Sequence, residues 1–247
     1  MELREYARLY ELENDLWWFR GMRAISVALL ERHLSKCSGL RVLDAGCGTG
    51  GMIETLATLG AVTGIDASGK ALGWARRGKS NSLVQGSVTT LPFRDDSFDL
   101  VTSFDVLYHA NVPDDAVALS EIVRVLRPGG TFLVRVPAYD KLRSRHDEAV
   151  HTRQRYGKKE LVAKLRAARL EPVVVTFANC FLFPVALARR VAERLFQSRR
   201  LSSEVARVPW VIDRLLGTPL LLEAGIVRYV SLPFGLSLVS LARKAPA

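Results

Sequence analysis

The sequence predicts an α/β protein whose core is a doubly wound, mostly parallel β-sheet. Short apolar runs alternate with helical patterns from residue 40 to about residue 171, which is typical of βαβ units. A glycine-rich stretch after the first apolar run indicates a tight turn from a strand into a helix. The predicted strands are Leu40–Ala45, Ala61–Ile65, Ser82–Gln85, Phe98–Ser103, Thr131–Val136, Pro172–Phe177 and Gly235–Ala242.

Two segments lie outside the alternation of strands and helices. Residues 1–36 have a helical pattern with three adjacent aromatic residues, and we expect them to form a lid over the open strand ends. The alternative is that the aromatic residues only pack the N-terminal helix against the core. Residues 181–233 separate the last two strands by more than fifty residues, far beyond a hairpin loop, so they should form a helical insertion. The core then comprises residues 37–180 and a final strand within 234–247. Its helices are expected over Gly51–Leu59, Gly69–Arg77, Asp114–Leu126 and Lys158–Ala168.

The insertion is apolar, basic and interrupted by prolines. Pro219 should separate two short helices, around Trp210–Leu216 and Leu220–Tyr229. Such apolar helices must bury a face. A cap over the substrate or an interface between two copies of the chain is favoured, and contact with an anionic membrane is the alternative.

Composition and charge indicate which class of protein the chain belongs to. The chain has 247 residues, 49% of them hydrophobic, and a formal net charge of +10. Residues 141–169 and 189–200 are strongly basic, which is typical of a solvated helix face or of a surface that meets an anionic partner. Three cysteines give neither a disulfide framework nor a metal-binding spacing. With no apparent secretory leader or membrane span, the sequence favours a reduced, cytoplasmic protein without a metal ion, peripheral to a membrane at most.

The glycine-rich turn after the first strand fits two cofactor templates. Gly46, Gly48 and Gly51 match the dinucleotide-binding pattern, and Asp66 follows at the spacing of a ribose-binding acid. The glycines alone therefore leave a nicotinamide-dependent oxidoreductase open. The following motifs favour the other template.

The sequence resembles the class I S-adenosylmethionine-dependent methyltransferases over about residues 40–136. In that family an acid stands two positions before a G-x-G-x-G turn, as Asp44 does here, and a second acid ends strand two, as Asp66 does. Three further stretches resemble the family in order and spacing: Leu91–Phe93, Ser97–Val101 and Glu121–Gly130. The resemblance implies a Rossmann-like sheet of about seven strands with an antiparallel last strand.

The resemblance also assigns a cofactor site for S-adenosylmethionine. Asp44 would hold the ammonium group or order the turn, Asp66 would accept both ribose hydroxyls, and Ala67 would pack on the adenine. A helix N-cap is the alternative for Asp66. The family often has an acid where this chain has Ser87, and Cys47 is interpreted as a small turn residue. The implied cofactor-binding residues are Trp18, Arg20, Asp44, Gly46, Cys47, Gly48, Gly50, Asp66, Ala67, Ser87, Val88 and Phe104.

The predicted chemistry lies in the loops that follow strands four and five. Ligands of open α/β sheets bind at the carboxyl ends of the strands, so residues 104–109 should face the cofactor. The candidate catalytic residues are His109, Tyr108 and His146, and a histidine bonded only within its own loop is the alternative for His109. A clamp for an anionic acceptor is predicted from Tyr139, Arg145, His151, Arg155 and Tyr156, although a solvent-exposed connection is the alternative for each.

These observations favour methyl transfer to a small acceptor that is anionic or lipophilic, such as a prenyl diphosphate, a lipid-linked intermediate or a sugar-containing metabolite. A nucleic-acid methyltransferase is an alternative because the chain is basic, but no motif for a flipped base and no appended RNA-binding module is found, so no nucleic-acid partner is expected. A cofactor-binding protein without catalysis that docks on membranes is the second alternative. The acceptor, the methylated atom and the oligomeric state stay open.

Overall fold

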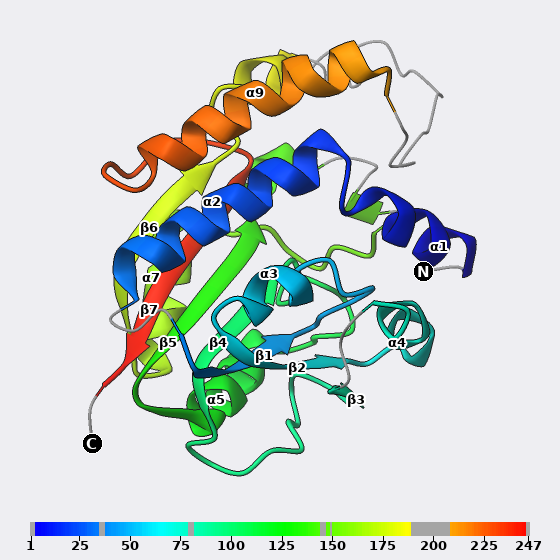
Figure 1. The fold of residues 1–247 in the computed structure, drawn as a ribbon. Coiled ribbons are helices and arrows are strands. Elements are labelled where there is room, and N and C mark those ends of the chain that lie inside the picture. Colours follow the sequence, from blue (N-terminus) through cyan, green and yellow to red (C-terminus); the bar gives the residue numbers. More distant parts are fainter. Residues whose placement is uncertain are drawn as a thin grey trace.

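The computed structural model describes residues 3–34, 38–78, 82–143, 147–148, 150–188 and 208–245. Its centre is a seven-stranded sheet with the strand order β3-β2-β1-β4-β5-β7-β6 (Figure 1). Six strands run parallel, and β7 alone runs antiparallel between β5 and β6. The predicted fold class is confirmed. The strands are β1 Leu40–Ala45, β2 Gly60–Asp66, β3 Leu83–Gln85, β4 Phe98–Phe104, β5 Leu126–Pro137, β6 Leu170–Ala178 and β7 Ser237–Lys244.

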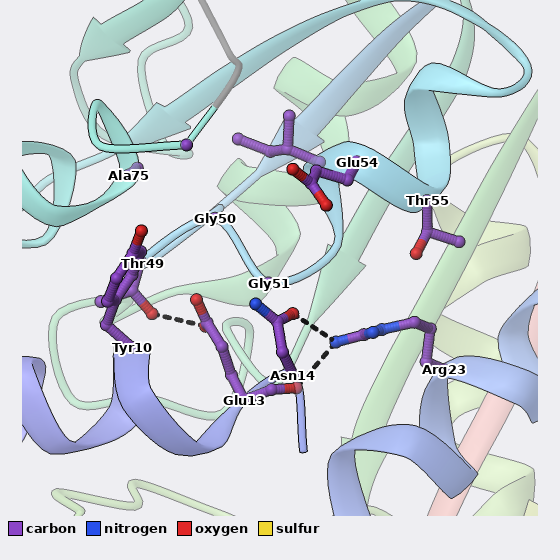
Figure 2. Close-up of a pocket in the computed structure, with 12 residues that line it drawn as sticks. Tyr10, Glu13, Asn14, Arg23, Thr49, Gly50, Gly51, Glu54, Thr55 and Ala75 are labelled. Carbon is purple, nitrogen blue, oxygen red and sulfur yellow. Dashed lines mark hydrogen bonds between the residues drawn. The ribbon is translucent and has the colours of Figure 1, made fainter. Parts of the chain in front are cut away.

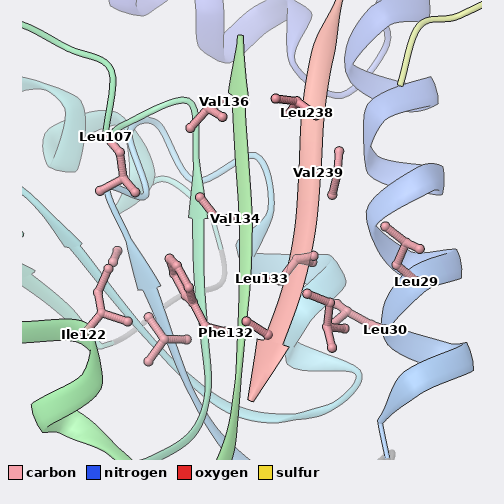
Figure 3. Close-up of a cluster of buried hydrophobic side chains, with 14 of the residues drawn as sticks. Leu29, Leu30, Leu107, Ile122, Phe132, Leu133, Val134, Val136, Leu238 and Val239 are labelled. Atoms are coloured by element: carbon pink, nitrogen blue, oxygen red, sulfur yellow. The ribbon is translucent and has the colours of Figure 1, made fainter. Parts of the chain in front are cut away.

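Helices cover both faces of the sheet. Figure 3 shows Ile122 of one helix and Leu29 and Leu30 of another on opposite sides of β5 and β7. All three side chains are almost fully buried, as expected for a core closed from both sides. The helices are α1 Leu3–Leu12, α2 Trp17–His33, α3 Ile53–Ala57, α4 Gly69–Ala75, α5 Asp115–Val125, α7 Lys158–Ala167 and α9 Trp210–Ile226, with a short 3-10 helix at Asp140–Leu142.

Local sequence explains where two core helices begin. Ser68 caps α4 by accepting a hydrogen bond from the backbone N–H of Ala71 at 3.3 Å. Asp114 caps α5 by accepting from the N–H of Ala116 at 2.8 Å. Ser and Asp are among the best N-cap residues because their side-chain oxygens satisfy N–H groups that have no partner inside the helix. α4 therefore begins directly beyond the carboxyl end of β2, whereas α5 begins after the loop 105–114 that follows β4.

The region predicted as an insertion contains one long helix instead of two short ones. Residues 183–188 are helical, and α9 then runs through Pro219 without a break. The prediction of a helix boundary at Pro219 was wrong. A proline inside a helix costs about 3 kcal/mol, but α9 packs along α2, and the side chain of Leu220 fills the space over Gly21, where a Cβ would lie 2.4 Å away. Tertiary packing thus overrides the local signal.

No helix of the described residues is long and apolar enough to span a bilayer.

Candidate cofactor and active site

The glycine-rich turn lies at the carboxyl end of β1. Gly46, Gly48 and Gly50 have positive φ angles of 89°, 55° and 98°, which other residues adopt only with strain. A Cβ on Gly46 would lie 2.2 Å from Val106, whereas nothing lies within 4 Å of the corresponding position on Gly48. The turn is therefore tightly packed at its first glycine and open at its second, where a ligand can approach the backbone.

Asp66 lies beside this turn, at the end of β2. One of its carboxylate oxygens accepts the N–H of Gly48 at 2.9 Å, and the other accepts the N–H of Ser68 at 2.8 Å. Ser68, not Asp66, is the N-cap of α4. A carboxylate can accept about four hydrogen bonds, so each oxygen keeps capacity for one hydroxyl of a ribose. Ala67 is exposed next to it, at the position that the resemblance gives to adenine packing.

Three other predicted cofactor residues, Asp44, Cys47 and Ser87, lie in β1, in the glycine-rich turn and in the turn after β3. Asp44 is buried in β1 and accepts the hydroxyl of Thr102 at 2.8 Å, and burial raises its pKa to about 6. Cys47 is buried too, and burial raises the pKa of its thiol well above the usual range, so the thiol stays protonated. The hydroxyl of Ser87 contacts Thr89, so it orders its own turn in this structure.

The ends of β4 and β5 bring a third group of residues to the same edge. Arg135 of β5 donates to the carboxylate of Asp105 at 2.5 and 2.8 Å. Its guanidinium also lies 5.1 Å from the ring centre of Phe104 and 5.2 Å from that of Trp18. Trp18 and Phe104 therefore meet across one buried cation. Arg135 was not among the predicted residues, although a single arginine inside an apolar strand could have indicated it.

The side chain of Arg20 lies against α9. Its guanidinium donates to the carboxylate of Asp213 on α9 at 2.7 Å, and the same carboxylate accepts the backbone N–H of Trp17 at 2.8 Å. Arg20 thus pairs with an acid of α9, and its contact with the cofactor stays a prediction.

His109 and Tyr108 follow β4. The Nδ1 atom of His109 accepts the backbone N–H of Asn111 at 3.1 Å, so in the neutral ring the proton sits on Nε2. Burial, followed by the nearby His151, lowers the pKa of His109, and the two ring centres are 6.0 Å apart. Burial raises the pKa of Tyr108. At neutral pH both side chains are therefore uncharged, and His109 in this tautomer offers Nε2 as a hydrogen-bond donor while its Nδ1 accepts from Asn111. His146 lies outside the described residues.

The described residues of the predicted clamp contact different partners. Tyr139 stacks on Phe177, with ring centres 5.2 Å apart. Arg155 is buried against Asp147, and Tyr156 is almost fully buried with its hydroxyl donating to Asp115 at 2.6 Å. The structure differs from the prediction for Arg155 and Tyr156, because their polar atoms already bind partners inside the protein. Arg145 lies outside the described residues.

A small pocket, which the sequence analysis did not predict, lies on the other side of the glycine-rich turn. Figure 2 shows a pocket of about 100 Å³ between the turn, α3, α4 and the end of α1. Glu13 points into it and accepts the hydroxyl of Thr49 at 2.5 Å. The guanidinium of Arg23 donates to the carbonyl of Glu13 and to the side chain of Asn14 at 2.7 and 3.2 Å. The segment after α1 is thereby tied to the turn that would carry the cofactor.

We expect Glu13→Gln to stabilise the protein above neutral pH. Burial raises the pKa of Glu13 from 4.5 to about 7, so folding favours the protonated carboxyl. This contribution to stability is complete below pH 4.5 and is lost as the pH rises through about 7. The substitution should therefore raise the free energy of unfolding by about 1–3 kcal/mol at pH 8 and by little at pH 4.5, as measured by urea denaturation. Glu54→Gln, an exposed carboxylate at the same pocket, is the matched control. Parallel pH profiles for wild type and Glu13→Gln would contradict the assignment.

Part of the chain matches a known protein family. Residues 43–134 match the family described as "Methyltransferase domain". Residues 43–134 therefore form a methyltransferase domain, and the relatives support a class I S-adenosylmethionine-dependent methyltransferase. A protein of Mycolicibacterium smegmatis named a probable S-adenosylmethionine-dependent methyltransferase is 35% identical over 128 residues, which cover 51% of this chain and 48% of the relative. The demethylmenaquinone methyltransferase of Staphylococcus aureus is 35% identical over 139 residues, covering 51% and 53%.

The methyltransferase fold extends further than these sequence matches. A chain from the complex of the Haloferax volcanii Trm112 methyltransferase activator with a methyltransferase superposes with a TM-score of 0.63 at 23% identity, covering 98% of this chain and 97% of that one. The chain spans about half the length of the curated relatives it matches. The cofactor of the family is S-adenosylmethionine, and the open approach to Gly48 beside the carboxylate of Asp66 fits its ribose.

Proposed function

We propose that this methyltransferase transfers the methyl group of S-adenosylmethionine to a small, lipophilic acceptor. The observation that carries the proposal is the position of Asp66, which meets the glycine-rich turn at the carboxyl edge of a sheet with the order 3-2-1-4-5-7-6. This edge is where open α/β sheets bind their ligands. The methyltransferase-domain match over residues 43–134 supports the same reading.

In this proposal each group at the edge has a defined role. The backbone from Gly46 to Gly50 would lie along the methionine part of the cofactor, Asp66 would accept the ribose hydroxyls, and Ala67 and Val88 would flank the adenine. S-adenosylmethionine would supply an electrophilic methyl group. The acceptor atom forms a bond to that carbon while the carbon–sulfur bond breaks, so the protein mainly aligns the two and excludes water.

The N-terminal helices would form the lid of the site. Tyr10 of α1 contacts Trp74 of α4, with ring centres 5.4 Å apart, and Glu13 binds the glycine-rich turn. At the start of α2, Trp18 lies against Arg135. These contacts extend from the predicted adenine side to the ends of β4 and β5, so both parts of the cofactor would be covered by one segment.

A lipophilic acceptor is supported by an aromatic cluster beyond β5. Tyr139 stacks on Phe177 and contacts Phe183, which in turn lies 5.5 Å from Phe234. The name of the Staphylococcus aureus relative contains a lipophilic acceptor, demethylmenaquinone. The described cations at this edge, by contrast, already bind protein partners, as Arg135 and Arg155 do. A prenyl diphosphate still fits the proposal if Arg145 meets its head group.

Two measurements test the proposed function. Calorimetry should show binding of S-adenosylmethionine and none of NAD. Transfer of a labelled methyl group should then be assayed with a short-chain prenylated hydroquinone, farnesyl diphosphate and tRNA. Labelling of the hydroquinone or the diphosphate supports the proposal. Labelling of tRNA alone would favour a nucleic-acid methyltransferase, and NAD binding in place of S-adenosylmethionine would overturn the reading.

A further inference from the structure

The helix α9 forms the outermost layer on one side of the protein. Figure 1 shows it lying along α2, on the side of α2 that faces away from the sheet. Its inner face is buried at Gly217, Leu220 and Ala224. The two helices run in the same direction, because Asp213 near the start of α9 binds the first residue of α2 and Arg228 beyond its end binds Glu31 near the end of α2.

The outer face of α9 is an exposed apolar stripe. Val211, Leu215, Leu222, Ile226 and Tyr229 follow one another at spacings of 4, 7, 4 and 3 residues, so they share one side of the helix and of the turn after it. Leu215 is 71% exposed, Leu222 is 59% exposed and Tyr229 is 80% exposed. An apolar stripe along a whole helix is far more than the scattered apolar residues of an ordinary soluble surface, and it marks a contact surface.

The charges of α9 are divided between its two faces. Both of its acids point inward: Asp213 binds Trp17 and Arg20, and Glu223 is fully buried, accepting the backbone N–H groups of Asn179 and Phe181 at 2.7 Å each. Arg214 is exposed on the outer side. The outward side of the described helix therefore carries mainly apolar residues, with Thr218 and one cation, Arg214, and neither carboxylate of α9 lies on it.

We propose that the stripe of α9 docks on an anionic lipid membrane, with the helix in the plane of the headgroups. An interfacial helix of this kind combines an apolar face with cationic and aromatic residues. Trp210 is 72% exposed at one end of α9 and Tyr229 is 80% exposed just beyond the other, and both residue types suit the boundary between headgroups and acyl chains.

Charge complementarity selects the membrane over a second copy of the chain. The chain carries a formal net charge of +10, most of it in the basic segments 141–169 and 189–200, so two copies of the chain repel each other. An anionic bilayer attracts the same charge, because each basic residue near its surface gains from the negative surface potential.

Docking through α9 would also place the site next to the lipid. The N–H of Trp17 binds Asp213, so the start of α9 lies at the start of α2, where Trp18 reaches the ends of β4 and β5. A lipophilic acceptor could then reach the site from the bilayer. This last step rests on the proposed function, whereas the docking itself does not.

Vesicle co-sedimentation tests the docking without cofactor or acceptor. The full chain should bind vesicles of phosphatidylcholine with phosphatidylglycerol, bind pure phosphatidylcholine far less, and dissociate as salt is raised. The double variant Leu215→Gln/Leu222→Gln should bind the anionic vesicles at least about tenfold more weakly, because two large apolar side chains leave the interface. Val117→Gln, which changes an exposed apolar residue on α5, should bind like wild type.

Three results would overturn the docking proposal. The first is that wild type does not bind anionic vesicles, and the second is that the double variant binds them as tightly as wild type. The third is that wild type is a dimer in sedimentation equilibrium whereas the double variant is a monomer. Affinity for S-adenosylmethionine should stay unchanged in the double variant, which shows that it is folded. Vesicle binding together with failure of every methyl-transfer assay would reject the proposed function and leave the docking intact.

Discussion

Replacing Asp66 by alanine should weaken the binding of S-adenosylmethionine roughly 10- to 100-fold while the protein stays folded. The carboxylate would accept two ribose hydroxyls, and losing such charge-assisted contacts costs about 1.5–3 kcal/mol. The loss also releases the N–H of Gly48, which the carboxylate holds at 2.9 Å, so the open part of the turn becomes less ordered. Isothermal calorimetry gives the affinity, and thermal unfolding without cofactor checks the fold.

Two further variants separate the role of the ribose contact from that of the turn. Asp66→Asn keeps the shape of the side chain but only one acceptor oxygen, so it should lie between wild type and Asp66→Ala. Ser87→Ala should change the affinity less than about threefold, because its hydroxyl is engaged by Thr89. Unchanged affinity in Asp66→Ala would remove this residue from the cofactor site.

The central strand β1 could be predicted from the sequence because its burial leaves little choice of residue. In β1, five of six residues are buried, and the predicted Leu40–Ala45 coincides with the strand. The glycine-rich turn could be predicted too, since the positive φ angles at Gly46 and Gly50, 89° and 98°, favour glycine strongly. In both cases the physical demand is local, so one stretch of sequence carries the whole signal.

Features that depend on distant contacts could not be predicted in the same way. The continuity of α9 through Pro219 depends on Leu220 meeting Gly21, 199 residues earlier. Glu13 looks like an ordinary charge on a polar helix, and only the fold brings it to Thr49. The pattern of residues in one segment does not predict such long-range contacts, because the fold of the whole chain decides which distant residue each side chain meets.

Arg155 shows how the same limit changes the interpretation of a charged residue. In the sequence it lies in a basic run after strand five, and the prediction was a clamp for an anionic acceptor. In the structure its guanidinium donates to both carboxylate oxygens of Asp147, at 2.7 and 3.1 Å, and to the carbonyl of Ala138 at 3.0 Å. The two side chains are 5% and 3% exposed, so the pair holds the loop after β5 from inside the protein.

Arg155→Met should therefore destabilise the fold by about 3–5 kcal/mol, because removing one partner leaves a buried carboxylate without its guanidinium. Urea denaturation measures this loss. A second change, Asp147→Leu in the same chain, should restore much of the stability, since an apolar pair can replace a buried ion pair. Arg166→Ala, which breaks an exposed pair with Glu171, should cost less than about 1 kcal/mol. At temperatures where Arg155→Met stays folded, its KM for the acceptor should match wild type. A stable Arg155→Met with a raised acceptor KM would instead show that the guanidinium reaches the acceptor, as the sequence first suggested.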